Sequence, residues 1–215
     1  MPPSPPSLRS PLAILLAPLL VGLVLGIPDG AYGQAPDTAS GVTVLDHRYR
    51  TQDEDTAVPY VETPRAVVDS MLAMAGVTES DVVYDLGSGD GRIPIIAAEE
   101  YGARGVGIEI QERLVDTARA KARAAGVADR VEFRRQDLFE ADISEATVVT
   151  LYLLPEVNMK LRPKLFRELE PGTWVVSHGF DMEEWLPLST KEVRGRRLFL
   201  WRIPEEPPGF VEEQY

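Results

Sequence analysis

Apolar residues between positions 63 and 172 recur at the spacing of one helix face in four separate stretches. The first of these stretches, 63–77, has Thr63 followed by Pro64, a pair that predicts an N-cap and a first helical residue. Its apolar positions are Val67, Val68, Met71, Leu72 and Ala75. The same periodicity predicts helices within 92–102, 111–127 and 157–172.

Short apolar runs lie between these helices and predict strands. They span 81–87, 105–110, 130–138, 146–154 and 173–180. An alternating run at 196–203 predicts a last strand, and 190–193 is expected to pair beside it in a hairpin. Alternating strands and helices imply a parallel sheet with helices on both faces. We therefore expect a doubly wound α/β fold that binds its ligand outside the carboxyl ends of the strands.

The amino-terminal segment has a different pattern. Arg9 is followed by the uncharged stretch 10–28, and small residues stand at Ala31 and Gly33. This predicts a signal peptide in 1–33, cleaved after Gly33 or Ala35, with an uncleaved membrane anchor as the alternative. A cleaved signal would export the protein to the periplasm or the extracellular space, whereas an anchor would hold it in the membrane. Residues 34–57 are predicted to be a polar linker, and 205–215 an acidic tail.

Composition narrows the chemistry. The chain has no cysteine, so disulfides, thiolate nucleophiles and cysteine-based zinc sites are excluded. His47 and His178 are in no ligand spacing, so we expect no metal site. We interpret His178, within a strand pattern, as a core histidine rather than a base. The net charge of −12 predicts no binding to nucleic acid, because phosphates need neutralising cations.

Three glycines at alternate positions, Gly87, Gly89 and Gly91, follow the strand pattern of 81–87. Glycine permits positive φ and lets a ligand approach the main chain closely. Glu109 ends the next predicted strand. A carboxylate about 20 residues beyond such a turn is placed to accept the hydroxyls of a ribose. These residues together predict a nucleoside site.

The spacing of the turn favours S-adenosylmethionine over a dinucleotide. A dinucleotide site normally reads G-x-G-x-x-G, whereas this turn reads G-x-G-x-G. Asp85 and Asp90 add negative charge where a pyrophosphate would lie. Carboxylates repel phosphate and attract an ammonium or sulfonium group, both of which S-adenosylmethionine carries.

Residues 58–204 resemble the class I, seven-β-strand S-adenosylmethionine-dependent methyltransferases. YDLGSGDGRI matches their first motif, GIEI the second and RRQDLF the third. The stretches VPYVETP, QDLFEADISEATVVTLYLLP and LRPKLFRELEPGTWVVSHGFDMEEW are similar to the protein-lysine methyltransferases related to the enzymes that methylate ATP synthase subunit c and the adenine nucleotide translocase. The resemblance implies a methyltransferase domain over 58–204. It also implies a Rossmann-like sheet of seven mostly parallel strands with an antiparallel C-terminal strand.

The resemblance also implies cofactor-binding residues. Asp85 and the main chain of 87–89 would hold the methionine part, and Glu109 the ribose hydroxyls. Asp137 would bond the adenine amino group, with Leu138 beside the ring. The full expected set is Asp85, Gly87, Ser88, Gly89, Glu109, Asp137 and Leu138.

The acceptor side departs from the wider family. LYLLP stands where many class I enzymes carry NPPY-like contacts, so we expect Tyr152, Leu153 and Pro155 to contact the acceptor, and Tyr60 to position its amino group. Tyr60 and Tyr152 are interpreted equally well as packing residues. The resemblance implies methyl transfer to an accessible lysine of a protein, a membrane protein being one candidate. Because the polar contacts are missing, the alternative is a non-catalytic, membrane-tethered module that binds S-adenosylmethionine.

Overall fold

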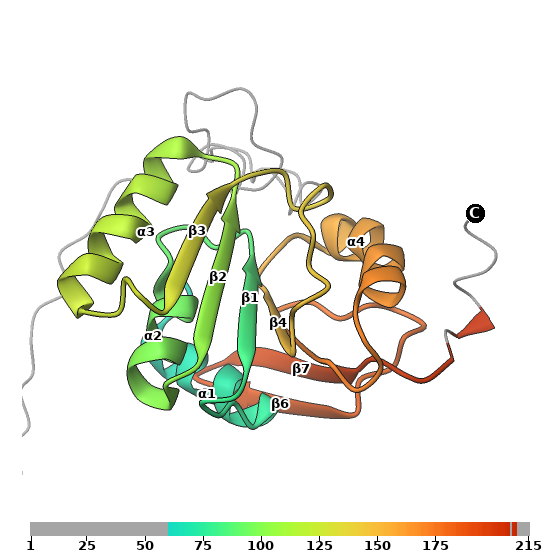
Figure 1. The fold of residues 1–215 in the computed structure, drawn as a ribbon. Coiled ribbons are helices and arrows are strands. Elements are labelled where there is room, and N and C mark those ends of the chain that lie inside the picture. The colour runs from blue at the N-terminus through green and yellow to red at the C-terminus, as the bar shows by residue number, and fades with distance from the viewer. Residues whose placement is uncertain (1–59, 207, 210–215) are drawn as a thin grey trace, which may run out of the picture. The chain divides into compact units, whose positions relative to one another are not determined.

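A computed structural model describes residues 60–206 and 208–209, which contain a seven-stranded sheet of order β3-β2-β1-β4-β5-β7-β6 (Figure 1). The strands are β1 (Val82–Leu86), β2 (Arg104–Glu109), β3 (Val131–Arg135), β4 (Val148–Leu151), β5 (Trp174–His178), β6 (Ser189–Val193) and β7 (Arg196–Arg202). The helices are α1 (Arg65–Ala75), α2 (Arg92–Tyr101), α3 (Glu112–Ala125) and α4 (Pro155–Glu168).

The strand pairing confirms the predicted fold. Strands β3, β2, β1, β4 and β5 pair in parallel, and β7 pairs antiparallel with both β5 and β6. The predicted hairpin of 190–193 with 196–203 is therefore present. Its turn places both Arg194 (φ 51°) and Gly195 (φ 74°) at positive φ, as a two-residue hairpin of the right twist requires.

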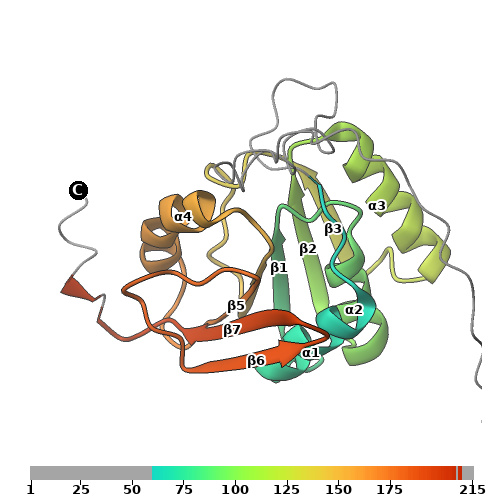
Figure 2. The same cartoon turned by 180° about the vertical axis from the view of Figure 1, so that it is seen from behind.

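Helices cover both faces of the sheet, as Figures 1 and 2 show from opposite sides. Successive residues of β1 point to opposite faces: Val83 packs in the core that contains α1 and α2, whereas Tyr84 and Leu86 pack in the core that contains α4. A smaller core joins α2, α3 and Phe133 of β3. The alternation leaves Asp85, the next residue on the Val83 face, near the carboxyl end of its strand.

The prediction that Thr63 caps the first helix is wrong. Helix α1 begins at Arg65, and its N-cap residue is Pro64, which makes no side-chain capping bond. The Thr63 hydroxyl instead shares a hydrogen bond of 3.2 Å with Nδ1 of His178. A tertiary contact across the chain has replaced the local one.

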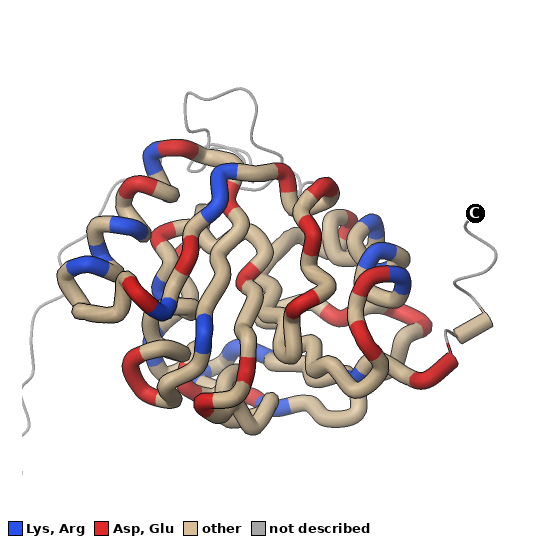
Figure 3. The backbone as a smooth tube through the Cα atoms, viewed as in Figure 1, with Lys and Arg blue, Asp and Glu red and all other residues tan. Residues whose placement is uncertain are grey.

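Charged side chains are distributed over the helices and loops with both signs interspersed, and the central strands β4 and β5 carry none (Figure 3). Strands buried on both faces favour such apolar runs.

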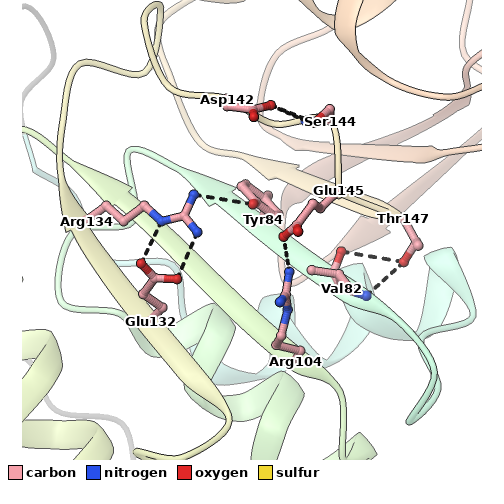
Figure 4. A network of polar contacts seen from close by, with 9 residues as sticks. All are labelled: Val82, Tyr84, Arg104, Glu132, Arg134, Asp142, Ser144, Glu145 and Thr147. Carbon is pink, nitrogen blue, oxygen red and sulfur yellow. Dashed lines mark hydrogen bonds and ion pairs between the residues drawn. The ribbon is translucent and has the colours of Figure 1, made fainter.

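The connection from β3 to β4 contains no named helix and is fastened by polar contacts (Figure 4). Thr147 Oγ1 accepts from the main-chain N–H of Val82 at 2.9 Å. Arg104 pairs with Glu145. These contacts hold the connection against β1 and β2, so the loop after β3 leaves the sheet from a fixed position.

Several predicted segments lie outside the described residues: the signal peptide or anchor of 1–33, the linker of 34–57, and most of the tail of 205–215. The domain boundaries therefore stay predictions. Among the helices of 60–206 and 208–209, none is long and apolar enough to cross a membrane.

Replacing Gly91 with alanine is expected to destabilise the fold far more than the same change at Gly126. Both glycines have positive φ, of 78° and 74°. A Cβ on Gly91 would lie 2.5 Å from the Phe133 ring, whereas one on Gly126 would meet nothing within 4 Å. Overpacking of a core costs about 1–3 kcal/mol, so Gly91→Ala should lose about 2 kcal/mol more unfolding free energy in urea titrations. Equal losses would contradict this packing.

Candidate active site

A pocket opens at the carboxyl ends of the parallel strands, where ligands of such sheets bind. Its lining comes from the turn after β1, from the segments that follow β2, β3 and β4, and from residues 60–63, which precede α1. We call residues 60–63 the strap. The structure thus gathers one site from five separate stretches of chain.

The glycine turn forms one wall of the pocket. Gly87 and Ser88 each donate a main-chain N–H to the carbonyl of Ile108 at 2.9 Å. The Tyr60 ring packs directly on Gly89, which has a φ of 54°. A Cβ on Gly89 would lie 2.3 Å from that ring. The strap therefore lies on the turn at a distance that only glycine permits.

Asp85 is the penultimate residue of β1 and lines the pocket. The side chain is 4% exposed and accepts a hydrogen bond from Thr150 Oγ1 at 2.7 Å. Burial raises its pKa from 3.8 to about 7, because a charge there lacks hydration. A cationic ligand group would relieve that penalty.

Glu109, at the end of β2, and Asp137, after β3, both line the pocket. Glu109, 8% exposed, accepts main-chain N–H groups of Gly89 and Gln111, one on each carboxylate oxygen at 2.9 Å. Asp137 is half-buried and accepts the N–H of Phe139 at 2.9 Å. These bonds orient both carboxylates in the pocket and leave lone pairs for a ligand. Leu138 lines the pocket beside them.

Asp90 has a different role from the one its position in the motif predicts. It is 2% exposed and pairs with Arg92 at 2.6 Å and with Lys121. Burial favours its neutral form, but the hydrogen bonds from Arg92 and Lys121 prevail and lower its pKa to about 2. Two cations thus neutralise the Asp90 charge, and repulsion of a pyrophosphate rests on Asp85 and Glu109.

Arg92 also fastens the strap. Its guanidinium donates to the carbonyl of Thr63 at 3.0 Å and to the phenol oxygen of Tyr60 at 3.4 Å, and it pairs with Glu62 at 2.9 Å. Burial and the Asp90 charge raise the pKa of Tyr60 to about 12, so its phenol is neutral. One side chain therefore joins the strap to the glycine turn.

The acceptor-side predictions divide. Tyr60 and Tyr152 both line the pocket, whereas Pro155 is an exposed first residue of α4 and lies outside the lining. Leu153, also expected at the acceptor, lines the pocket and is 3% exposed; it packs so close to Gly87 that a Cβ on Gly87 would lie 2.8 Å from it. The acceptor end is thus aromatic and apolar.

His178 is a buried core histidine, as the strand pattern predicts. It is 1% exposed, bonds to Thr63, and stacks on Tyr152 with ring centroids 3.8 Å apart. Burial, with a smaller contribution from Arg196, lowers its pKa to about 4. The imidazole is therefore neutral at pH 7.

Two exposed hydrophobic residues in the lining went unpredicted. Ile110 is 47% exposed and Phe139 is 40% exposed. Ile110 directly follows Glu109, and Phe139 comes two positions after Asp137. This closeness to the motif carboxylates is the sequence feature that could have predicted them in the pocket. Large apolar side chains left partly in water at a pocket mark a surface that a flat ligand can cover.

The pocket fits S-adenosylmethionine. Buried Asp85 suits its ammonium group, Glu109 suits a ribose, and Ile110 and Phe139 suit an adenine. Within the part of the chain that the structure describes, there is no group of three or more acidic or histidine side chains arranged to hold a metal.

Comparison with known proteins agrees with this pocket. A model of the ANTKMT methyltransferase domain matches residues 85–189. A protein-lysine N-methyltransferase of Saccharolobus islandicus is 50% identical over 131 residues, which cover 60% of this chain and 81% of that one. The chain belongs to the ANTKMT methyltransferase family. The adenine nucleotide translocase lysine N-methyltransferase of Mus musculus is 37% identical, over 61% of this chain and 57% of its own length.

Among solved structures, one from Salinibacter ruber in complex with S-adenosyl-L-homocysteine is 65% identical, with a TM-score of 0.69. The match covers 69% of this chain and 97% of that one, which is described as an RNA methyltransferase. This member of the ANTKMT methyltransferase family is therefore an S-adenosylmethionine-dependent methyltransferase.

Proposed function

We propose that the enzyme transfers methyl groups to the side-chain amine of a lysine in a protein. The observation that carries the proposal is the chemistry of the acceptor end, which combines the neutral phenol of Tyr60 with the aromatic ring of Tyr152 and the apolar Leu153. An uncharged amine fits such a wall, because burial there disfavours the ammonium form. The name of the Saccharolobus islandicus relative supports the same acceptor.

The cofactor roles extend this proposal. Asp85 would accept hydrogen bonds from the ammonium of the methionine part, and Glu109 would accept them from the ribose hydroxyls. Asp137 would accept from the adenine amino group, with Leu138 and Phe139 against the ring. When bound, S-adenosylmethionine supplies a methyl group on a positively charged sulfur.

We assign no general base for the lysine, because the described lining contains no histidine and its carboxylates Asp85, Glu109 and Asp137 are assigned to the cofactor. A lysine has a reference pKa near 10.4, so its deprotonation at pH 7 costs about 4.6 kcal/mol. Neutral His178, with its pKa of about 4 and Nδ1 bonded to Thr63, is unsuited to accept that proton. We propose that the proton passes to water before attack and that Tyr60, Tyr152 and Leu153 hold the free amine in line with the methyl group. log(kcat/KM) should then rise with pH toward the pKa of lysine.

RNA is the competing acceptor, because the Salinibacter ruber relative is described as an RNA methyltransferase. The charges favour protein. The chain carries a net charge of −12, and acidic residues recur along the described chain (Figure 3). Arg92, a cation in the pocket lining, is already paired with Asp90 and Glu62. A phosphate backbone needs cations that are free to neutralise it.

Label transfer separates the two acceptors. The full chain is incubated with methyl-labelled S-adenosylmethionine in two reactions. One contains the membrane fraction of a bacterial extract and the other contains its soluble fraction. We expect label that is lost on proteolysis and kept after ribonuclease treatment, with an Asp85→Ala variant as the matched control without transfer. Label that ribonuclease removes would overturn the proposal in favour of RNA, and no label in either polymer would favour the non-catalytic module.

A further inference from the structure

The ring of Tyr152 stacks on His178, whose Nδ1 is hydrogen-bonded to Thr63, and neither His178 nor Thr63 has been assigned a role toward the cofactor. We infer that His178 is a positioning residue, fixed by Thr63 of the strap, that sets the orientation of Tyr152 toward the acceptor. The inference rests on the proposed function, because it assigns Tyr152 to the acceptor wall.

Three separate elements meet at this contact. Thr63 comes from the strap, Tyr152 directly follows β4, and His178 ends β5. The Thr63 hydroxyl and His178 Nδ1 are 3.2 Å apart. The His178 and Tyr152 rings stack with centroids 3.8 Å apart and an interplanar angle of 25°. The strap, the imidazole and the phenol therefore form one continuous set of contacts.

Burial distinguishes the holding residues from the held one. Thr63 is 4% exposed and His178 is 1% exposed, whereas Tyr152 is half-buried and lines the pocket. His178 thus covers one face of the phenol ring while the residue remains open to the pocket. A ring supported on one face by a fixed partner keeps a single plane, which is what in-line alignment of an acceptor amine requires.

The strap links this support to the cofactor side. Arg92 holds the carbonyl of Thr63 and the phenol of Tyr60, and Tyr60 lies on Gly89 of the turn. When the strap is seated on the glycine turn, the same segment places the Thr63 hydroxyl on His178. The acceptor wall is therefore complete only when the strap is seated.

The charge state of His178 agrees with this role. Burial keeps its pKa at about 4, so the imidazole stays neutral over the working range of the enzyme and the bond to Thr63 persists. Because His178 does not titrate in this range, the pH dependence of kcat/KM should reflect the ionisation of the lysine.

Four variants test the inference. Thr63→Val removes the hydroxyl and keeps the shape, and Thr63→Ser restores it. His178→Phe keeps a ring to stack and loses the bond. Thr117→Val on α3 is the matched control, because its hydroxyl bonds only locally, to the Arg113 carbonyl. Label transfer is followed with the extract fraction that accepts the most label, and binding of S-adenosylhomocysteine is followed by calorimetry.

We expect Thr63→Val and His178→Phe each to lower kcat about tenfold, with S-adenosylhomocysteine affinity within about twofold of the unmodified enzyme. Thr63→Ser and Thr117→Val should keep near-normal rates. The double variant should be no slower than either single one, since both remove the same bond. The pH profile should keep its shape throughout.

Three kinetic results would each overturn the inference. The first is a normal rate in both single variants, and the second is a loss of affinity equal to the loss of rate. The third is a loss of kcat above about 100-fold with an altered pH profile, which would indicate that His178 acts as a base. If the unmodified enzyme labels no lysine, the proposed function fails instead.

A second readout needs no acceptor. The chain has two histidines, so His47→Gln leaves one imidazole, and its Nδ1 resonance should shift in Thr63→Val; an unchanged resonance would also overturn the inference.

Discussion

At about pH 8 the Asp85→Asn enzyme is expected to unfold at higher urea concentration than the unmodified enzyme while binding S-adenosylhomocysteine much more weakly. Burial raises the Asp85 pKa from 3.8 to about 7. The folded state must therefore hold a costly charge above pH 7, and asparagine removes that charge. Asparagine also still accepts the hydrogen bond from Thr150.

The sign of the pH effect follows from the raised pKa. The folded state binds the Asp85 proton more tightly than the unfolded state, so the contribution of Asp85 to stability is greatest below about pH 4 and falls as pH rises toward 7. The stability gap between Asp85→Asn and the unmodified enzyme should therefore widen by about 3 kcal/mol from pH 5 to pH 8. Loss of the carboxylate should weaken cofactor binding by about 1.5–3 kcal/mol, roughly 10- to 150-fold. In the unmodified enzyme, affinity should rise between about pH 6 and pH 8 as Asp85 ionises.

Asp90→Asn is the matched control, because the pKa of Asp90 is lowered to about 2. Its charge stabilises the fold above pH 4, and that contribution is lost as pH falls through 2. Asp90→Asn should therefore destabilise the enzyme at pH 5 and pH 8 alike. If Asp85→Asn behaved in the same way, the description of Asp85 as a costly buried charge would be wrong.

Gly89→Ala is expected to abolish most methyl transfer and cofactor binding. Its Cβ would lie 2.3 Å from the Tyr60 ring, so the strap has to leave the glycine turn. Displacing the strap removes the Tyr60 wall and the Thr63 contact together. We expect the affinity for S-adenosylhomocysteine to fall by about 2–3 kcal/mol, roughly 30- to 150-fold, measured by calorimetry.

Two comparisons isolate the overlap with Tyr60 from backbone strain. Gly76 has a similar positive φ of 66°, and a Cβ there would meet nothing within 4 Å, so Gly76→Ala should bind the cofactor normally. In a Tyr60→Ala background, Gly89→Ala should cost much less affinity than it does alone. An equal cost in both backgrounds would show that Tyr60 is not the residue displaced.

Much of the fold was predictable because its signals are local. The periodicity of 63–77 and 111–127, and the apolar runs between helices, reflect which face of each element is buried. The glycine turn was also predictable, since Gly89 needs positive φ and Glu109 ends the next strand. Both features involve neighbours within one β-α-β unit.

The remainder of the site depends on contacts between distant positions. Thr63 and His178 are separated by 115 positions, so the sequence predicted a local helix cap in place of their hydrogen bond. Asp90 is neutralised by Lys121, 31 positions further along, which a motif cannot show. Pro155 ends the predicted acceptor stretch, yet it begins α4 and is not part of the pocket lining. Side-chain direction after a strand depends on the helix that follows.

Mass mapping of the transferred methyl group tests the central claim most directly. The enzyme is incubated with S-adenosylmethionine that carries a deuterated methyl group and with the fraction that accepts the most label, and the protein products are digested and sequenced by mass spectrometry. We predict deuterated methyl groups on lysine side-chain nitrogens, present with the unmodified enzyme and absent with Asp85→Ala. Deuterium found in nucleosides, or on residues other than lysine, would contradict the account.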